Sequence, residues 1–250
     1  KRGFKGPIYA QQATADLMSV MLMDAASISQ GDAERFNRHR RPGEAEAQPL
    51  YTRQDVDAAM EQVRELPYDT RSPVLPGIDI AYREAGHILG SASVELWADG
   101  RKLVFSGDLG PKGTPILRDP ATIDAADLVL MESTYGDRLH RDRAETIREL
   151  GGILDAAWHE GGTVLIPAFA VGRSQELLYW FARHWDEWGM SRWRIFLDSP
   201  MAAKVVDIYD RHAELFDEEA GRVWRDKPNP FRLPNLHFTQ SREESMAINR

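Results

Sequence analysis

Apolar and polar residues alternate with a period of two in the middle of the chain, the pattern of half-buried β-strands. Ile78 to Glu84 follows this pattern, and Val94 to Trp97 and Leu103 to Ser106 are predicted to be the next strands. The dipeptide Asp99-Gly100 between the last two segments is a strong signal for a two-residue turn, so they are predicted to form a hairpin. Leu128 to Glu132 begins as a continuous apolar run, which predicts a strand buried on both faces.

The first 70 residues predict one strand and two helices around a polar excursion. Gly6 to Ala10 is predicted to be a short buried strand, and the apolar spacing after it predicts a helix over Thr14 to Ala25 with Thr14 as N-cap. Gln30 to Pro49 is charged and poor in apolar residues, so we expect it on the surface. Thr52 to Leu66 is predicted to be a second helix that opens with a capping box between Thr52 and Asp55.

In the second half of the chain, helical and strand patterns alternate. Ala144 to Trp158 and Ser174 to Trp185 have the apolar spacing of helices. Thr163 to Pro167 and Arg194 to Asp198 are short runs that predict strands, and Ser199-Pro200 opens a further helix. This alternation predicts a parallel sheet covered by helices, and therefore an α/β fold.

Composition limits the class of protein. The chain has 250 residues, of which 42% are hydrophobic and 28% charged, as expected of one large or two smaller folded domains. It has no cysteine, so a zinc site would have to use histidine and carboxylate ligands. With no secretory leader and no apolar run of about 18 residues, we expect a cytoplasmic protein without a membrane span. The net charge of −8 argues against general capture of nucleic acid but leaves a local site open.

Two residues that can bind a metal ion flank the predicted hairpin. His87 lies in Gly-His-x-x-Gly-Ser, and Asp108 lies in Phe-Ser-Gly-Asp-Leu-Gly. Either residue alone is more often structural, since a lone histidine is usually solvated and an Asp after Gly usually belongs to a turn. Together they have small neighbours that allow close approach of backbone and metal, and the hairpin fixes their separation. The stretch from Gly86 to Asp108 is therefore the candidate centre of an active site.

The chain contains five different short motifs, namely Gly86 to Ala92, Ser106 to Gly110, Glu132 to Asp137, Ile166 to Arg173 and Leu197 to Ala202. With these motifs the chain resembles the metallo-β-lactamase fold, in the β-CASP branch of hydrolases that process nucleic acids. The first two motifs are moderately specific to the fold, and the last three, in this order, point to the β-CASP branch. The resemblance covers nearly the whole chain.

The resemblance implies a site with two zinc ions and hydrolysis of a phosphodiester bond. His87 matches the third metal-binding motif of the family, and Asp108 matches the fourth, whose carboxylate bridges the two ions. Such a pair activates a water for in-line attack and neutralises charge on the phosphate. Glu132 matches the acidic residue that opens the β-CASP region, where it would orient its neighbours or support proton transfer. Its alternative role is to cap the turn that follows. The implied metal ligands are His87 and Asp108, and the implied catalytic residues are Asp108 and Glu132.

One motif of the family is not found in these residues. The pattern His-x-His-x-Asp-His, which supplies most of the zinc ligands, does not occur in the sequence, and the resemblance implies that it precedes Lys1. Each zinc ion needs at least three protein ligands, and His87 and Asp108 cannot supply two such sets. We therefore expect an internal segment of an enzyme, which by itself binds zinc weakly and does not cleave RNA. The later histidines are interpreted as ordinary surface or core residues: His140, His159, His184, His212 and His237.

Two residues at predicted strand-to-helix turns are candidates for binding a substrate phosphate. Arg173 opens a helix, where backbone N–H groups and the helix dipole favour anions. Ser199 follows Asp198 at the next turn, on the edge of the predicted parallel sheet where ligands usually bind. The alternative for Arg173 is an ordinary surface arginine.

These inferences combine into a two-domain α/β segment. Residues 1–136 would form part of an αββα metallo-β-lactamase domain, and residues 137–250 the first part of a β-CASP domain with a parallel sheet. The implied function is zinc-dependent cleavage of RNA, single-stranded and by exonuclease or endonuclease action, in a protein that could form a homodimer. Two alternatives stay open: a small-molecule hydrolase such as a thioesterase or lactonase, and a non-catalytic scaffold of an RNA-processing complex.

Overall fold

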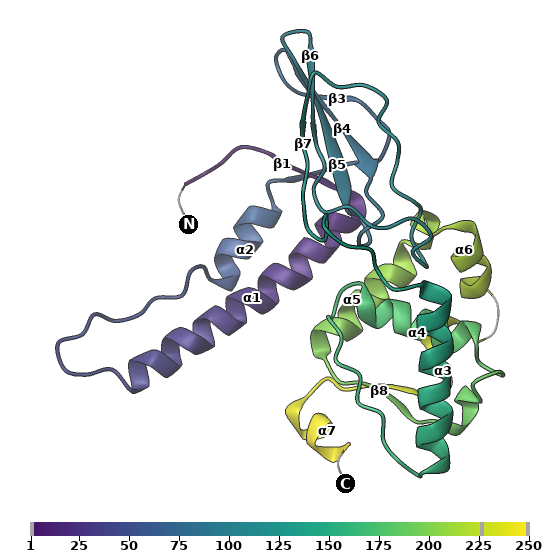
Figure 1. Cartoon of the computed structure of the whole chain (residues 1–250). Helices are drawn as coiled ribbons and strands as arrows, with labels where there is room; N and C mark the ends of the chain where they lie inside the picture. The colour runs from purple at the N-terminus through teal and green to yellow at the C-terminus, as the bar shows by residue number, and fades with distance from the viewer. Residues whose placement is uncertain (1–2, 226–227, 249–250) are drawn as a thin grey trace.

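The computed structural model describes residues 3–225 and 228–248. A strand-rich first half and a helix-rich second half meet near the start of a long helix that projects away from both (Figure 1). The helices and strands are, in chain order, β1 (Ile8–Gln11), α1 (Gln12–Arg38), α2 (Arg53–Met60), β2 (Val63–Leu66), β3 (Ser72–Leu75), β4 (Ile78–Glu84), β5 (Ala92–Ala98), β6 (Arg101–Phe105), β7 (Leu128–Leu130), α3 (Arg143–His159), α4 (Arg173–Arg183), β8 (Ile195–Leu197), α5 (Pro200–Arg211), α6 (Glu218–Arg225), β9 (Leu236–Phe238) and α7 (Arg242–Ala247).

A five-stranded sheet in the order β3-β4-β5-β6-β7 dominates the first half. Neighbours are antiparallel except β6 and β7, which are parallel. The predicted hairpin is confirmed, because β5 pairs with β6 and both turn residues, Asp99 and Gly100, have positive φ (49° and 73°), as a two-residue type I′ turn requires. Since β4, β6 and β7 run in the same direction, their carboxyl ends lie at the same end of the sheet.

The prediction that Leu128 to Glu132 is buried on both faces is wrong. The strand β7 has three residues and forms the edge of the sheet, and Leu128 and Val129 are 52% and 55% exposed. An apolar run indicates a doubly buried strand only where neighbouring layers cover both faces. Within the described part of the chain, those layers do not cover β7.

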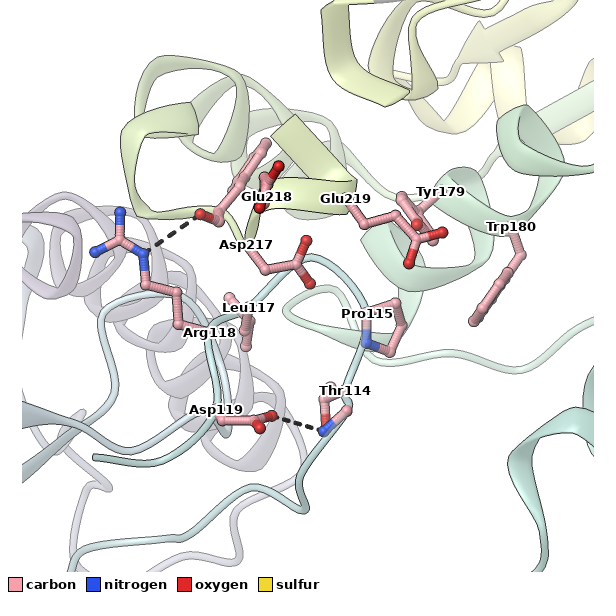
Figure 2. Close-up of a pocket in the computed structure, with 12 residues that line it drawn as sticks. Thr114, Pro115, Leu117, Arg118, Asp119, Tyr179, Trp180, Asp217, Glu218 and Glu219 are labelled. Carbon is pink, nitrogen blue, oxygen red and sulfur yellow. Dashed lines mark hydrogen bonds between the residues drawn. The ribbon is translucent and has the colours of Figure 1, made fainter. Parts of the chain in front are cut away.

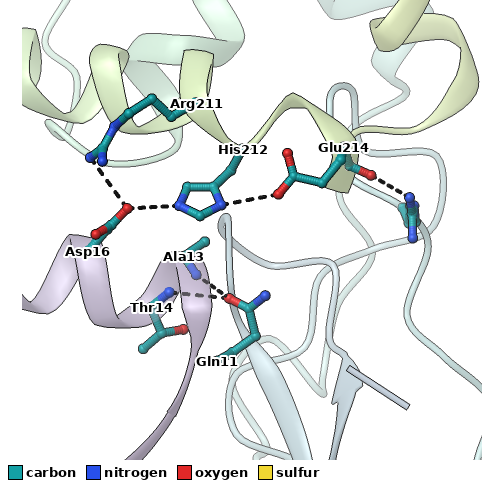
Figure 3. A network of polar contacts seen from close by, with 8 residues as sticks. Gln11, Ala13, Thr14, Asp16, Arg211, His212 and Glu214 are labelled. Atoms are coloured by element: carbon teal, nitrogen blue, oxygen red, sulfur yellow. Dashed lines mark hydrogen bonds and ion pairs between the residues drawn. The ribbon is translucent and has the colours of Figure 1, made fainter. Parts of the chain in front are cut away.

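The start of α1 also differs from the prediction, which made Thr14 the N-cap. The N-cap is Gln11, whose buried side-chain oxygen accepts hydrogen bonds from the backbone N–H groups of Ala13 (2.6 Å) and Thr14 (3.3 Å) (Figure 3). The Thr14 hydroxyl instead donates to the carbonyl of Gly90, 76 residues away (2.5 Å). The helix also continues to Arg38, so the exposed excursion begins later than predicted.

The second predicted helix is correct at its start and wrong at its end. Thr52 and Asp55 form the predicted capping box, with the Thr52 N–H donating to the Asp55 carboxylate at 2.8 Å. The helix α2 stops at Met60, and Val63–Leu66 becomes strand β2, which pairs in parallel with β1. Pairing with a distant strand therefore overrides the local helical spacing.

The second half confirms the α/β class. Its predicted helices appear as α3, α4 and α5 around one hydrophobic core, and β8 and β9 pair in parallel. The strand predicted for Thr163 to Pro167 is wrong, because this segment has no regular secondary structure and Leu165 is 89% exposed. A strand needs a hydrogen-bonding neighbour, and the described residues do not pair with this segment.

The two halves are joined where α1 packs against α5. The Asp16 carboxylate on α1 contacts His212 Nε2 (2.8 Å) and the guanidinium of Arg211 (3.3 Å), and His212 Nδ1 lies 3.2 Å from Glu214 (Figure 3). These contacts fix the start of α1 against the end of α5. Among the described residues, the helices are too short or too polar to cross a membrane.

Candidate metal centre

The three acidic and imidazole groups singled out from the sequence lie at one end of the sheet. His87 follows β4, Asp108 follows β6 and Glu132 follows β7, so each comes just after the carboxyl end of one of three strands that run in the same direction. His87 and Asp108 are close to each other, with His87 Nε2 4.0 Å from Asp108 Oδ2. Their side chains are 45% and 77% exposed, so both can still receive a ligand from solvent.

Glu132 is tied to the loop that carries Asp108. Its carboxylate accepts a hydrogen bond from the backbone N–H of Leu109 at 2.5 Å, and its own N–H donates to the hydroxyl of Ser106 at 3.0 Å. The pKa of Glu132 is lowered, first by the Leu109 N–H, then by Thr134 and by the nearby His87. Glu132 therefore stays ionised at neutral pH and holds the loop on either side of Asp108.

The loop that carries His87 is organised by its own serine and by a preceding glutamate. The Ser91 hydroxyl accepts hydrogen bonds from the N–H groups of His87 (3.0 Å) and Ile88 (3.2 Å). The Glu84 carboxylate accepts from the Gly86 N–H at 2.8 Å. These bonds satisfy consecutive backbone donors in a segment that is neither helix nor strand, which limits its freedom. Ser91 belongs to the first sequence motif, but its role in holding His87 was not predicted.

The loop that carries His87 and the loop that carries Asp108 are in close backbone contact at Gly110. The Gly110 N–H donates to the Ala85 carbonyl at 2.8 Å, and a Cβ atom on Gly110 would lie only 1.8 Å from the Gly86 oxygen. The backbones can approach this closely only because Gly110 has no side chain. This contact brings the loops of His87 and Asp108 together, and it explains the glycine at position 110.

Arg173 and Ser199 occupy different places relative to this site. Arg173 is the first residue of α4, and the adjacent Gly172 packs against Ile88, since a Cβ on Gly172 would lie 3.2 Å from Ile88 Cγ2. The side chain of Arg173 is 62% exposed, and its guanidinium pairs with Glu176 at 2.9 Å. Ser199 is the N-cap of α5, with its hydroxyl oxygen accepting from the Ala202 N–H at 3.2 Å. The structure thus brings Arg173, but not Ser199, next to the loop of His87.

The donors at this site suit zinc, because imidazole nitrogen and carboxylate oxygen are both ligands that zinc accepts. Over residues 3–225 and 228–248, however, no group of three or more His, Cys, Asp or Glu side chains is arranged to hold an ion. His87 and Asp108 therefore fit one part of a metal centre, and a complete centre needs further ligands.

A separate cavity of about 710 Å³ lies between residues 113–119, α4 and the start of α6 (Figure 2). Four carboxylates line it, from Asp119, Asp217, Glu218 and Glu219. Burial raises the pKa of Asp217, and the charges of Glu219 and Asp119 raise it further. The cavity does not include His87 or Asp108, and its negative charge is unsuited to a phosphate.

Residues 174–250 match the family model of the Beta-Casp domain. The chain is 39% identical over 250 residues to Ribonuclease TTHA0252 of Thermus thermophilus, an alignment that covers 100% of this chain and 53% of the relative. It is 26% identical over 251 residues to Endoribonuclease YSH1 of Candida glabrata (98% of this chain, 31% of the relative). It is also 33% identical over 174 residues to an RNase J-like protein of Methanocaldococcus jannaschii (68% of this chain, 37% of the relative). The chain thus spans about half the length of the first of these proteins and about a third of the other two.

Proposed function

We propose that the chain belongs to the β-CASP ribonucleases of the metallo-β-lactamase fold and is part of a metal-dependent enzyme that hydrolyses RNA, since residues 174–250 match the Beta-Casp domain model and the chain is 39% identical to Ribonuclease TTHA0252. The observation that carries the proposal is the convergence of His87, Asp108 and Glu132 at the carboxyl ends of β4, β6 and β7. We assign residues 1–136 to a metallo-β-lactamase domain and residues 137–250 to a β-CASP domain.

In this proposal the metal is a pair of zinc ions, and His87 and Asp108 are two of the protein ligands. A bound pair of divalent ions supplies activation of the attacking water and charge neutralisation of the scissile phosphate. The 4.0 Å separation of His87 Nε2 and Asp108 Oδ2 and the exposure of both side chains support the assignment. The remaining ligands would come from outside the described residues.

We assign Glu132 the role of orienting Asp108 rather than donating a proton. A general acid must be protonated before it acts, whereas the lowered pKa of Glu132 keeps its carboxyl group ionised. The hydrogen bond from the Leu109 N–H would let Glu132 hold the Asp108 loop during the reaction.

For the substrate we propose single-stranded RNA, with one of its phosphates contacted by Arg173. The exposure of Arg173, its position at the N-terminus of α4 and the packing of Gly172 on Ile88 support this role. The phosphate would have to compete with Glu176 for the guanidinium. Ser199 is a second candidate for a phosphate contact, although its hydroxyl oxygen already caps α5. Homodimerisation remains a prediction.

The test uses protein made from the complete reading frame. Metal content is measured by mass spectrometry, and cleavage is followed on an RNA oligonucleotide labelled at its 5′ end. We expect bound zinc and cleavage, and we expect His87→Ala and Asp108→Asn each to reduce the rate by about 100-fold or more. The matched control is His159→Ala, because His159 is exposed on α3 and contacts its own helix.

Full activity in His87→Ala and Asp108→Asn would refute the assignment of the metal centre. Metal binding without RNA cleavage, but with hydrolysis of a thioester or lactone, would favour the small-molecule hydrolase. Absence of metal binding and of any hydrolysis would favour the non-catalytic scaffold. A circular RNA substrate separates the two modes of cleavage, since only an endonuclease can cut it.

A further inference from the structure

A tyrosine of the second half reaches into the loop that carries His87. Tyr209 lies on α5, and its hydroxyl oxygen accepts a hydrogen bond from the backbone N–H of Leu89 at 3.3 Å, across 120 positions of sequence. Tyr209 and Leu89 are each 1% exposed, so water cannot take over this bond. Leu89 is two residues after His87, inside the Gly-His-Ile-Leu-Gly-Ser motif.

The position of the Tyr209 hydroxyl is set by the core of the second half. The Tyr209 ring packs against Phe216 and Phe231, with ring centroids 6.5 Å and 6.1 Å away. Burial raises the pKa of Tyr209 to about 12, partly offset by the backbone N–H groups of Leu89 and Gly172. The hydroxyl therefore stays neutral at physiological pH and lies where the His87 loop and the segment before α4 meet.

The His87 loop is also held by the first half. The Thr14 hydroxyl donates to the Gly90 carbonyl at 2.5 Å. A Cβ on Gly90 would lie 2.6 Å from the Thr14 nitrogen, so α1 and the loop are in direct backbone contact. Two adjacent residues, Leu89 and Gly90, are thus fixed by two different parts of the chain.

We propose that Tyr209 is a positioning residue, which sets the place of the His87 imidazole by holding the Leu89 N–H and so couples the second domain to the metal centre. The coupling to metal rests on the proposed function, whereas the order of the loop does not. His87 is itself exposed and lies 4.0 Å from Asp108, so its position depends on the backbone of its loop.

Loss of the Tyr209 hydroxyl would leave a buried N–H without an acceptor. Such a donor is costly, and the loop can relieve the cost by moving Leu89 towards water or another acceptor. His87, two residues away, would move with it. Groups that orient metal ligands indirectly typically change metal affinity by about 10–100-fold when they are removed.

The test compares wild type and Tyr209→Phe, again in protein made from the complete reading frame. Hydrogen exchange of the metal-free protein should show about tenfold or greater loss of protection at Leu89, while the amides of α5 keep theirs. Zinc affinity, measured by titration against a chelator, should fall by about 10–100-fold. The matched control is Tyr179→Phe, which removes another buried tyrosine hydroxyl, on α4, without touching the His87 loop.

Unchanged exchange at Leu89, together with zinc affinity within twofold of wild type, would overturn the proposal. If wild type binds no zinc but Tyr209→Phe still loses protection at Leu89, the proposed function fails and the positioning of the loop stands. If Tyr209→Phe does not fold, hydrogen exchange of the wild-type protein alone tests the proposal. Its Leu89 amide should exchange as slowly as the core of α5, and exchange as fast as in an open loop would refute the role of Tyr209.

Discussion

The contact between Gly110 and Gly86 can be tested by adding a single methyl group. Gly110→Ala would place a Cβ atom 1.8 Å from the Gly86 oxygen and 2.8 Å from the His87 nitrogen. Both neighbours are backbone atoms, which cannot rotate away as a flexible side chain can. The two loops must therefore separate, and His87 must move relative to Asp108.

The size of the effect follows from the distances. Cβ contacts shorter than about 3.0 Å are essentially not found, so the backbones must separate by about 1.2 Å, the difference between 3.0 and 1.8 Å. Overpacking of this kind costs about 1–3 kcal/mol of folding stability. A displacement of about 1 Å between reacting groups can reduce a catalytic rate by about 100-fold. We therefore expect a modest loss of stability and a large loss of metal binding and activity.

The assays are thermal unfolding, zinc titration and RNA cleavage, in parallel on wild type, Gly110→Ala and Gly152→Ala. Gly152 is the matched control because it lies inside α3 with nothing within 4 Å of its added Cβ. Alanine there should raise stability by about 0.5–1 kcal/mol. If Gly110→Ala were as stable as wild type and bound zinc equally well, the interlocked loops would not determine the geometry of the site.

Three further changes test other parts of the structure. Glu95 is buried between Arg83 (2.6 Å) and Lys102, and although burial raises its pKa, the hydrogen bonds from Lys102 and Arg83 outweigh this and lower it. Glu95→Gln should lower the free energy of unfolding by about 2 kcal/mol at pH 7. Breaking a fully buried ion pair would cost more, but here both cations reach solvent. A carboxylate whose pKa is lowered by folding stabilises the folded state only at pH values where it is ionised. The difference in stability between wild type and Glu95→Gln, measured by urea unfolding, should therefore shrink as the pH is lowered. A difference that stays constant with pH would contradict this explanation. Asp217→Asn keeps an oxygen for the Ala220 N–H but removes a carboxylate whose pKa burial raises. A carboxyl group with a raised folded-state pKa costs folding stability once pH rises through that pKa and the group ionises. Asp217→Asn should therefore be more stable than wild type by up to about 1 kcal/mol at pH 7 and equally stable at about pH 3, as measured by thermal unfolding. An equal gain in stability at both pH values would refute the charge effect. Ser106→Ala removes the acceptor of the Glu132 N–H and should cost about 1–2 kcal/mol of folding stability. RNA cleavage should fall by more than the loss of folded protein accounts for, and a fall no larger than that loss would indicate a structural role alone.

Local patterns predicted much of the fold. Period-two alternation located β4, and the Asp99-Gly100 turn located the hairpin of β5 and β6, because two-residue turns with positive φ match the twist of a hairpin. The capping box at Thr52 and the spacing of α3, α4 and α5 were likewise local signals. Failures came where distant partners decide: Val63–Leu66 pairs with β1, and Thr14 binds Gly90 instead of capping its helix.

What the sequence by itself determined about this protein is the set of groups that can do chemistry and the class of fold that carries them. His87 and Asp108 stand out because each follows a predicted strand within a motif rich in small residues, and Glu132 stands out because it ends a predicted strand and matches a family motif. Their convergence follows only from the order of the strands, because the antiparallel β5 between β4 and β6 makes β4, β6 and β7 run in the same direction.

Only the tertiary structure decided how these groups are held. The glycine contact at Gly110, the acceptance of the Leu109 N–H by Glu132 and the reach of Tyr209 to Leu89 join residues that are far apart in the chain. A buried hydroxyl or a missing side chain has no local signature, because its value depends on which backbone atom lies opposite it after folding.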